Sequence, residues 1–186
     1  MVTTTVVAIV SSPRRNGNSG TIVNEMVKAI REEGKEVKVH HLNVLKDARG
    51  CQACMACKRA GRCTLMDDIE PILEDIRMCE GLILSTPCYF GEACGQFRLL
   101  QDRFFGFMND GFVPNIEAQK KLSVVVTCGS GTDAAKELQG KIERSMVQFF
   151  GFKNVGGICM SKGNPPDVAA NSPGLLEEAR KIGGLF

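Results

Sequence analysis

The sequence predicts a doubly wound α/β fold, in which a five-stranded parallel sheet is covered by helices on both faces. Two observations support this. Short β-branched apolar runs alternate along the chain with stretches that have the period of an amphipathic helix. No internal repeat or linker divides the chain, so we expect one domain over residues 1–186. Strands that alternate with helices are joined by right-handed crossovers and therefore lie parallel.

The first unit of this pattern is a strand, a loop and a helix. Residues 4–11 form a continuous β-branched apolar run, which is typical of a strand buried on both faces. The polar, turn-rich loop 12–20 follows. From Thr21 the apolar residues recur on one face of a helix, which Gly34 ends. A second strand is expected over residues 36–43, where apolar and polar residues alternate.

The rest of the chain repeats the alternation after one interruption. A cysteine-rich insert occupies residues 50–66, and Asp67 and Asp68 then have the character of a helix cap and first turn, ahead of an apolar helical stripe that ends near Ile76. The later elements are expected as strands at 81–86, 122–127 and 154–160 and as helices at 95–107, 134–150 and 173–182.

Composition and charge exclude several classes of function. The 186 residues are 44% hydrophobic, which is enough for one substantial core. The net charge is only +2, and no basic run is dense enough to follow a nucleic-acid backbone. The N-terminus has no signal-peptide features, and no stretch approaches the roughly 18 apolar residues that span a bilayer. We therefore expect a soluble, cytoplasmic protein that binds neither nucleic acid nor membrane.

The loop after the first strand has the chemistry of an anion site. It places hydroxyls and amides at the start of a helix, where free N–H groups and the helix dipole favour a phosphate. In a sheet of this kind the ligand binds beyond the carboxyl ends of the strands, where the strand order reverses. A polar loop that only caps its helix is the alternative. The candidate residues are Ser11, Ser12, Arg14, Asn16, Asn18 and Ser19.

Two segments resemble a known family. Ser-Pro-Arg-Arg-Asn-Gly-Asn-Ser, residues 12–19, is similar to the loop that binds the FMN phosphate in NADPH-dependent FMN reductases and related multimeric flavodoxin-like proteins. Thr-Pro-Cys-Tyr-Phe-Gly, residues 86–91, resembles the loop that lies against the isoalloxazine ring in that family, and Gln96-Phe97-Arg98 and Asp102-Arg103 match its next helix. The resemblance covers nearly the whole chain in order.

This resemblance implies a flavodoxin-like fold that binds FMN. The loop can hold one terminal phosphate but lacks the glycine fingerprint for a pyrophosphate, which favours FMN over FAD. An aromatic pair beside a Gly-ended turn could flank a flat ring, although packing in the core is the alternative for both aromatic residues. The candidates for the ring side of the site are Thr86, Pro87, Cys88, Tyr89, Phe90, Gly91 and, in the loop after the fourth predicted strand, Gly129.

Four of the nine cysteines have the spacing of a metal site. Cys51, Cys54, Cys57 and Cys63 stand in a C-x2-C-x2-C-x5-C pattern, close in style to the cysteine run of ferredoxins. Zinc held by the same thiolates and redox cysteines without a metal are the alternatives. The pattern resembles that of the iron-sulfur flavoproteins, a branch of the same family. It implies a 4Fe-4S cluster that exchanges electrons with FMN across neighbouring subunits.

Together these features predict an electron-transfer flavoprotein. The resemblance implies a redox partner: an NAD(P)H or ferredoxin-type donor and a small acceptor such as a quinone or an oxygen species. Because the flavin carries the redox chemistry, no catalytic side chain is required. A homodimer or homotetramer is expected, with the apolar Met55, Leu65 and Met66 of the insert covered by a partner. An insert that folds back on its own domain is the alternative. A cluster-free NAD(P)H-dependent FMN or quinone reductase and a zinc-stabilised binding protein are the alternative functions.

Overall fold

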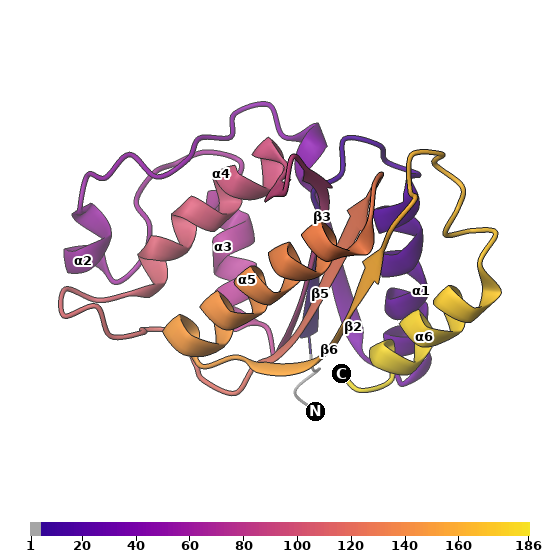
Figure 1. Cartoon of the computed structure of the whole chain (residues 1–186). Coiled ribbons are helices and arrows are strands. Elements are labelled where there is room, and N and C mark those ends of the chain that lie inside the picture. The colour runs from indigo at the N-terminus through magenta and orange to yellow at the C-terminus, as the bar shows by residue number, and fades with distance from the viewer. Residues whose placement is uncertain (1–4) are drawn as a thin grey trace.

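The computed structural model describes residues 5–186, so Thr4, the first residue of the predicted first strand, lies outside the described residues. The predicted doubly wound fold is confirmed: a twisted parallel sheet has helices on both faces (Figure 1). The parallel strands are β1 (Thr5–Val10), β2 (Glu36–His41), β3 (Gly81–Tyr89), β5 (Lys121–Cys128) and β6 (Lys153–Met160). The α-helices are α1 (Asn18–Glu32), α2 (Ala56–Ala60), α3 (Glu70–Met78), α4 (Gly95–Arg103), α5 (Thr132–Phe150) and α6 (Pro173–Gly183).

The order of strands across the sheet is β2-β1-β3-β5-β6. The chain moves outward from β1 to β2, returns to the other side of β1 for β3, and then continues in that direction. The order therefore reverses between β1 and β3, as in flavodoxin-like sheets, where the ligand crevice lies at the carboxyl edge of these two strands.

The sheet is buried on both faces by two hydrophobic clusters. Val7 and Ile9 of β1 pack with the helices α3, α4 and α5, whereas Val6, Ala8 and Val10 pack with α1 and α6. Successive side chains of a strand point to opposite faces, so an unbroken apolar run is what a strand between two helical layers needs. Figure 1 shows α1 and α6 together on one side of the sheet.

The structure adds a short strand that the sequence pattern did not predict. β4 (Glu92–Ala93) pairs antiparallel with the end of β3, which runs three residues beyond its predicted end, through Pro87 to Tyr89. β1 ends opposite Ser85, so at Pro87 the strand β3 pairs only with β5 and a missing N–H is tolerated. A two-residue strand is too short to show a period in the sequence.

Several helix boundaries also differ from the prediction, since α1 begins at Asn18, inside the predicted loop 12–20, and α5 begins at Thr132. The helix predicted over 95–107 is α4 followed by a 3-10 segment, η2 (Phe104–Phe107), and a second such segment, η1 (Leu42–Val44), ends β2. α3 begins at Glu70, and Oδ1 of Asp67 accepts the N–H groups of Ile69 and Glu70 at 3.1 and 3.2 Å, which is the expected capping role. Within residues 5–186, none of the helices has the length and apolar character needed to cross a bilayer.

Candidate functional site

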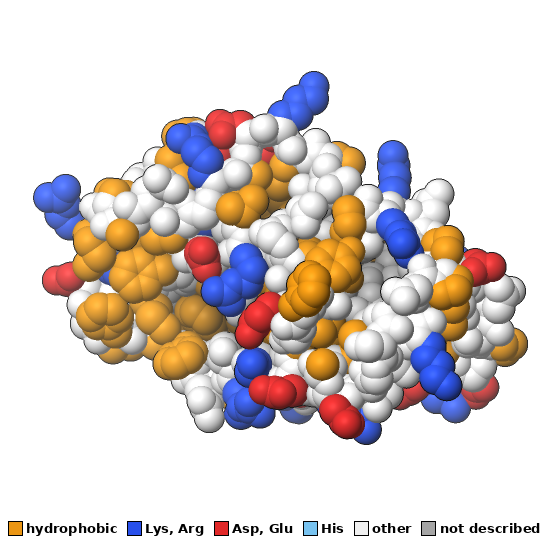
Figure 2. Space-filling model, turned by 45° about the horizontal axis from the view of Figure 1, so that its top comes forward, with side chains coloured by type: hydrophobic (Ala, Val, Ile, Leu, Met, Phe, Trp, Pro, Cys, Tyr) orange, Lys and Arg blue, Asp and Glu red, His pale blue; other side chains and the backbone are white. Residues whose placement is uncertain are grey.

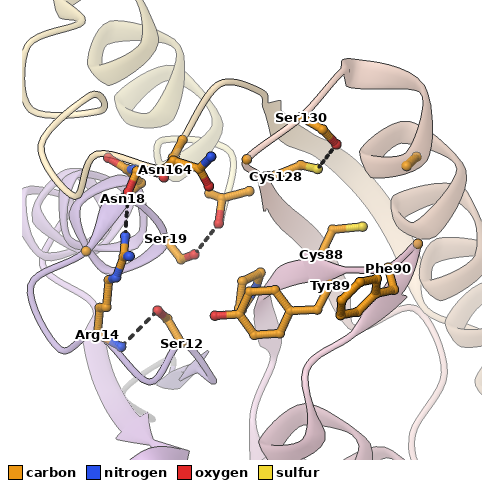
Figure 3. Close-up of a pocket in the computed structure, with 17 residues that line it drawn as sticks. Ser12, Arg14, Asn18, Ser19, Cys88, Tyr89, Phe90, Cys128, Ser130 and Asn164 are labelled. Atoms are coloured by element: carbon orange, nitrogen blue, oxygen red, sulfur yellow. Dashed lines mark hydrogen bonds between the residues drawn. The ribbon is translucent and has the colours of Figure 1, made fainter.

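A cavity of about 450 Å³ opens at the carboxyl edge of the sheet, where the strand order reverses. Figure 2 turns this edge toward the viewer and shows hydrophobic side chains at its centre. The volume lies within the range of about 300–1,000 Å³ that is usual for cofactor sites. Most of the predicted cofactor residues line this cavity (Figure 3): Ser12, Arg14, Asn18, Ser19, Pro87, Cys88, Tyr89, Phe90, Gly91 and Gly129.

One side of the cavity is polar and contains the start of α1. Gly17 precedes the helix, and no side chain caps the free N–H groups of its first turn. A Cβ at Gly17 would lie 2.9 Å from Cβ of Arg14, so a glycine lets the loop fold closely over the helix end. The guanidinium of Arg14 is anchored by a bond from Nη1 to the carbonyl of Asn164 at 2.7 Å. Free amides, a helix dipole and a cation together suit a phosphate.

The side chains of Asn18 and Ser19 are already bonded within the protein. Nδ2 of Asn18 donates to the carbonyls of Gly163 and Pro165 at 2.9 and 2.7 Å, and its Oδ1 accepts the N–H of Ala169 at 2.9 Å. The hydroxyl of Ser19 shares a hydrogen bond of 2.7 Å with that of Thr127. These two side chains therefore hold the end of β5 and the loop after β6 against α1, and their backbone amides are the groups that remain for an anion.

Three predicted residues lie outside the lining of the cavity. Ser11 is buried and donates its hydroxyl to the carbonyl of Ser85 at 2.5 Å. Thr86 is buried as well, and its hydroxyl accepts the N–H of Cys94 at 3.2 Å. Asn16 is exposed on the loop before α1. Ser11 and Thr86 thus support the strand ends from which the lining residues project.

The other side of the cavity is aromatic and is built on a tight turn. Tyr89 pairs with Glu92, so Phe90 and Gly91 form a two-residue turn between β3 and β4. Their φ angles are 54° and 83°, both left-handed, as a type I′ turn requires. This conformation is unusual for a bulky residue such as Phe90. Tyr89 and Phe90 are both exposed, so packing in the core does not explain them.

The ends of β5 and β6 complete the lining of the cavity. Thr127 and Cys128 end β5, and Ser130 follows in the loop where the sequence predicted Gly129. Gly163 and Asn164 follow β6, in a loop that the sequence analysis did not place at the site. A Cβ at Gly129 would lie 2.1 Å from Oδ1 of Asn164, so these two loops meet at a glycine. The signal that could have found the loop after β6 is positional, because it leaves the carboxyl end of a strand at the same edge as the first loop.

The four cysteines of the insert line a second cavity, of about 160 Å³. Cys51 and Cys54 are exposed, whereas Cys57 is buried. In the described part of the chain, no three His, Cys, Asp or Glu side chains converge as a metal-binding group. The donor set nevertheless has the chemistry of an iron-sulfur site, because four thiols from one short segment surround one space. The N–H of Ala53 also lies 3.5 Å from the sulfur of Cys51, as backbone groups do around cluster ligands.

A buried arginine connects this insert to the domain. Nε of Arg103 donates to the sulfur of Cys63 at 3.1 Å, and Nη1 and Nη2 donate to Oδ2 of Asp67 at 2.7 Å and to the carbonyl of Leu65 at 2.9 Å. Nη1 also reaches the carbonyl of Arg49 at 3.0 Å, on the other side of the insert. Burial alone would raise the pKa of Asp67, but Arg103 and the N–H groups of Arg49 and Ile69 together hold that pKa below its ordinary value.

Comparison with known proteins assigns the chain to a family. The family model described as NADPH-dependent FMN reductase matches residues 4–165. An iron-sulfur flavoprotein of Methanocaldococcus jannaschii is 39% identical over 98 residues, which cover 53% of this chain and 50% of that protein. An iron-sulfur flavoprotein of Archaeoglobus fulgidus is 27% identical over 150 residues, which cover 81% of this chain and 65% of that one. The chain thus spans about half to two thirds of the length of these relatives.

A solved structure has the same fold. The NAD(P)H:quinone oxidoreductase from Methanothermobacter marburgensis superposes with a TM-score of 0.76 over 98% of this chain and 96% of that one. The two sequences are 18% identical, so the likeness concerns the fold alone.

Proposed function

The chain belongs to the NADPH-dependent FMN reductase family, and from this premise we propose that it is a flavin-dependent oxidoreductase that binds FMN in the cavity at the carboxyl edge of β1, β3 and β5. One observation carries the proposal: the cavity has one side suited to the phosphate of FMN and one side suited to its flat isoalloxazine ring. The start of α1 and Arg14 form a cationic, donor-rich side, and Tyr89 and Phe90 form an aromatic side (Figure 3).

The chain's own groups have distinct tasks in this proposal. The amides of Asn18 and Ser19 and the guanidinium of Arg14 bind the phosphate, whose charge the dipole of α1 stabilises. Tyr89 and Phe90 flank the ring and shield it from water, and the backbone of the loop around Gly91 offers hydrogen bonds to its polar edge. When bound, FMN supplies the hydride and single-electron chemistry. We propose NAD(P)H or a ferredoxin-type protein as the donor and a small molecule such as a quinone as the acceptor.

We further propose that Cys51, Cys54, Cys57 and Cys63 hold a 4Fe-4S cluster that exchanges electrons with the flavin. Support comes from the cavity that the four thiols share and from the two relatives named as iron-sulfur flavoproteins. The N–H groups of Arg103 and Ala53 that point at sulfur atoms are of the kind that set cluster potentials. A second candidate is a reductase without a cluster. It is favoured by the exposure of Cys51 and Cys54 and by the lack, among residues 5–186, of three ligating side chains that converge.

The visible spectrum after anaerobic purification tests these proposals. Flavin bands above a broad brown absorption that bleaches with dithionite are the expected result. Flavin bands alone would establish the reductase without a cluster. Colourless protein that contains zinc would contradict both and favour a zinc-stabilised binding protein.

A further inference from the structure

Two cysteines outside the insert face each other at the cavity. Cys88 and Cys128 are directly opposite residues at the carboxyl ends of the neighbouring parallel strands β3 and β5. Opposite residues of paired strands project to the same face of a sheet. Both thiols line the cavity, and Figure 3 shows their side chains on adjacent strand ends, between Tyr89 and Ser130. The proposed function gives neither of them a task.

We propose that Cys88 and Cys128 are a redox-active dithiol, which hydroperoxide oxidises to a disulfide inside this cavity. The backbone meets the first requirement for the bond. Neighbouring strands lie about 4.7–4.9 Å apart, and the Cα atoms of disulfide-bonded cysteines lie about 4.4–6.8 Å apart. The Cβ atoms of such a pair lie about 3.5–4.5 Å apart, so the two strand ends move slightly closer as the side chains rotate and the bond forms. The proposal concerns the thiols alone and does not require the cofactor.

The surroundings give the two thiols different roles. The sulfur of Cys128 lies 3.2 Å from the hydroxyl of Ser130. Burial raises the pKa of Cys128, but hydrogen bonds from Ser130, Cys88 and the backbone of Gly129 outweigh it and leave that pKa below its ordinary value. Burial and then the neighbouring Cys128 raise the pKa of Cys88. The thiolate is the form that attacks peroxide, so Cys128 reacts first and Cys88 then resolves the sulfenic acid.

The reaction balances with peroxide as the only oxidant. The thiolate of Cys128 attacks one oxygen of hydrogen peroxide and the O–O bond breaks, which gives a sulfenic acid and hydroxide. This hydroxide takes up the proton that Cys128 had lost and becomes the first water. The thiol of Cys88 then attacks the sulfur of the sulfenic acid, the S–S bond forms, the S–O bond breaks, and the oxygen leaves with the proton of Cys88 as the second water. Overall, two thiols and one peroxide give one disulfide and two waters. Thiol reagents reverse the bond by exchange.

The other three cysteines outside the insert are poor competitors. Burial raises the pKa of Cys79 and of Cys159 to about 11, which keeps both as unreactive thiols. The sulfur of Cys94 is buried beside the carbonyl and hydroxyl of Ser11, at 3.3 and 3.4 Å, away from the cavity lining. Cys94 is a useful control because it lies in the same tryptic peptide as Cys88.

Peptide mapping of the full chain tests the proposal. The protein is reduced, freed of reductant, exposed to hydrogen peroxide, blocked with N-ethylmaleimide and digested with trypsin without reduction. We expect the peptide of residues 78–98, with N-ethylmaleimide on Cys79 and Cys94, linked to that of 122–136. Its mass should be two hydrogen atoms below the sum of the two peptides blocked at those two positions. The cysteines of the insert lie on other tryptic peptides and do not interfere. Dithiothreitol should abolish the linked species.

Variants identify which two cysteines form the bond. A negative result with the wild type is sufficient to overturn the proposal. Cys128→Ser and Cys88→Ser should each lose the linked peptide, whereas Cys94→Ser should retain it. Peroxide-treated wild type that contains no linked peptide, or only sulfinic acid at Cys128, would refute the dithiol. So would a linked pair of the same two peptides that persists in Cys88→Ser, because the partner of Cys128 would then be Cys79 or Cys94.

Discussion

At the scale of single residues, Arg14 is the cation that lines the polar side of the cavity. We predict that Arg14→Gln weakens FMN binding about 10- to 100-fold, because a hydrogen bond to a charged group contributes about 1.5–3 kcal/mol and each 1.4 kcal/mol is about tenfold. Fluorescence titration should show this loss for FMN but not for riboflavin, which has no phosphate. Arg15→Gln, an exposed neighbour outside the lining, is the matched control. Equal losses for FMN and riboflavin would mean that Arg14 only shapes the loop.

Arg103 is a residue whose loss should cost several kcal/mol of stability. Its side chain and that of Asp67 are fully buried, and Nη1 of Arg103 lies 2.7 Å from Oδ2 of Asp67. The variant Arg103→Met would therefore leave a buried carboxylate without its cation. Breaking such a pair costs about 3–5 kcal/mol. Urea unfolding should show this loss for Arg103→Met and less than about 1 kcal/mol for Arg98→Met, which removes an exposed i,i+4 pair on the same helix. Equal effects would contradict the anchoring role.

At the scale of elements, the turn between β3 and β4 holds Phe90 in a strained backbone conformation and places its ring at the proposed FMN site. Phe90 has φ 54°, and a residue that tolerates the left-handed region would remove a cost of about 1 kcal/mol. We predict that Phe90→Asn raises the melting temperature and lowers FMN affinity. Phe112, also exposed with φ 58°, lies outside the cavity lining, so Phe112→Asn should leave FMN affinity unchanged. A Phe90→Asn variant that keeps full affinity would remove the aromatic side from the proposed site.

The elements also show what the sequence could predict. All five parallel strands were predictable, because a run such as Val6 to Val10 must be covered on both faces. The five residues of α2 and the two of β4 are too few for a period to show. Polar residues of the first loop were recognisable as a group, but the bonds of Asn18 to residues 163, 165 and 169 join distant parts of the chain that no local pattern links.

At the scale of the whole molecule, an exposed apolar surface at the end that carries the insert has the character of a protein interface. Hydrophobic side chains gather on the left of Figure 2, and exposed Met55, Phe112 and Val113 belong to the insert and to the segment after η2. Such patches mark protein interfaces, and a second copy of the chain is the usual partner. We predict a homodimer or homotetramer in sedimentation velocity, which Phe112→Asp shifts toward the monomer. A wild type that stays monomeric at all concentrations would contradict electron transfer between subunits.

The central claim is that one chain binds both FMN and an iron-sulfur cluster at separate sites. Chemical analysis of flavin, iron and sulfide in anaerobically purified protein tests it most directly, with Cys57→Ser alongside the wild type. The account predicts FMN in both proteins, and iron and sulfide in equal amounts in the wild type only, because a cluster that loses one thiolate ligand is exposed to oxidation. Wild type without FMN, or with FMN but neither iron nor sulfide, would contradict it.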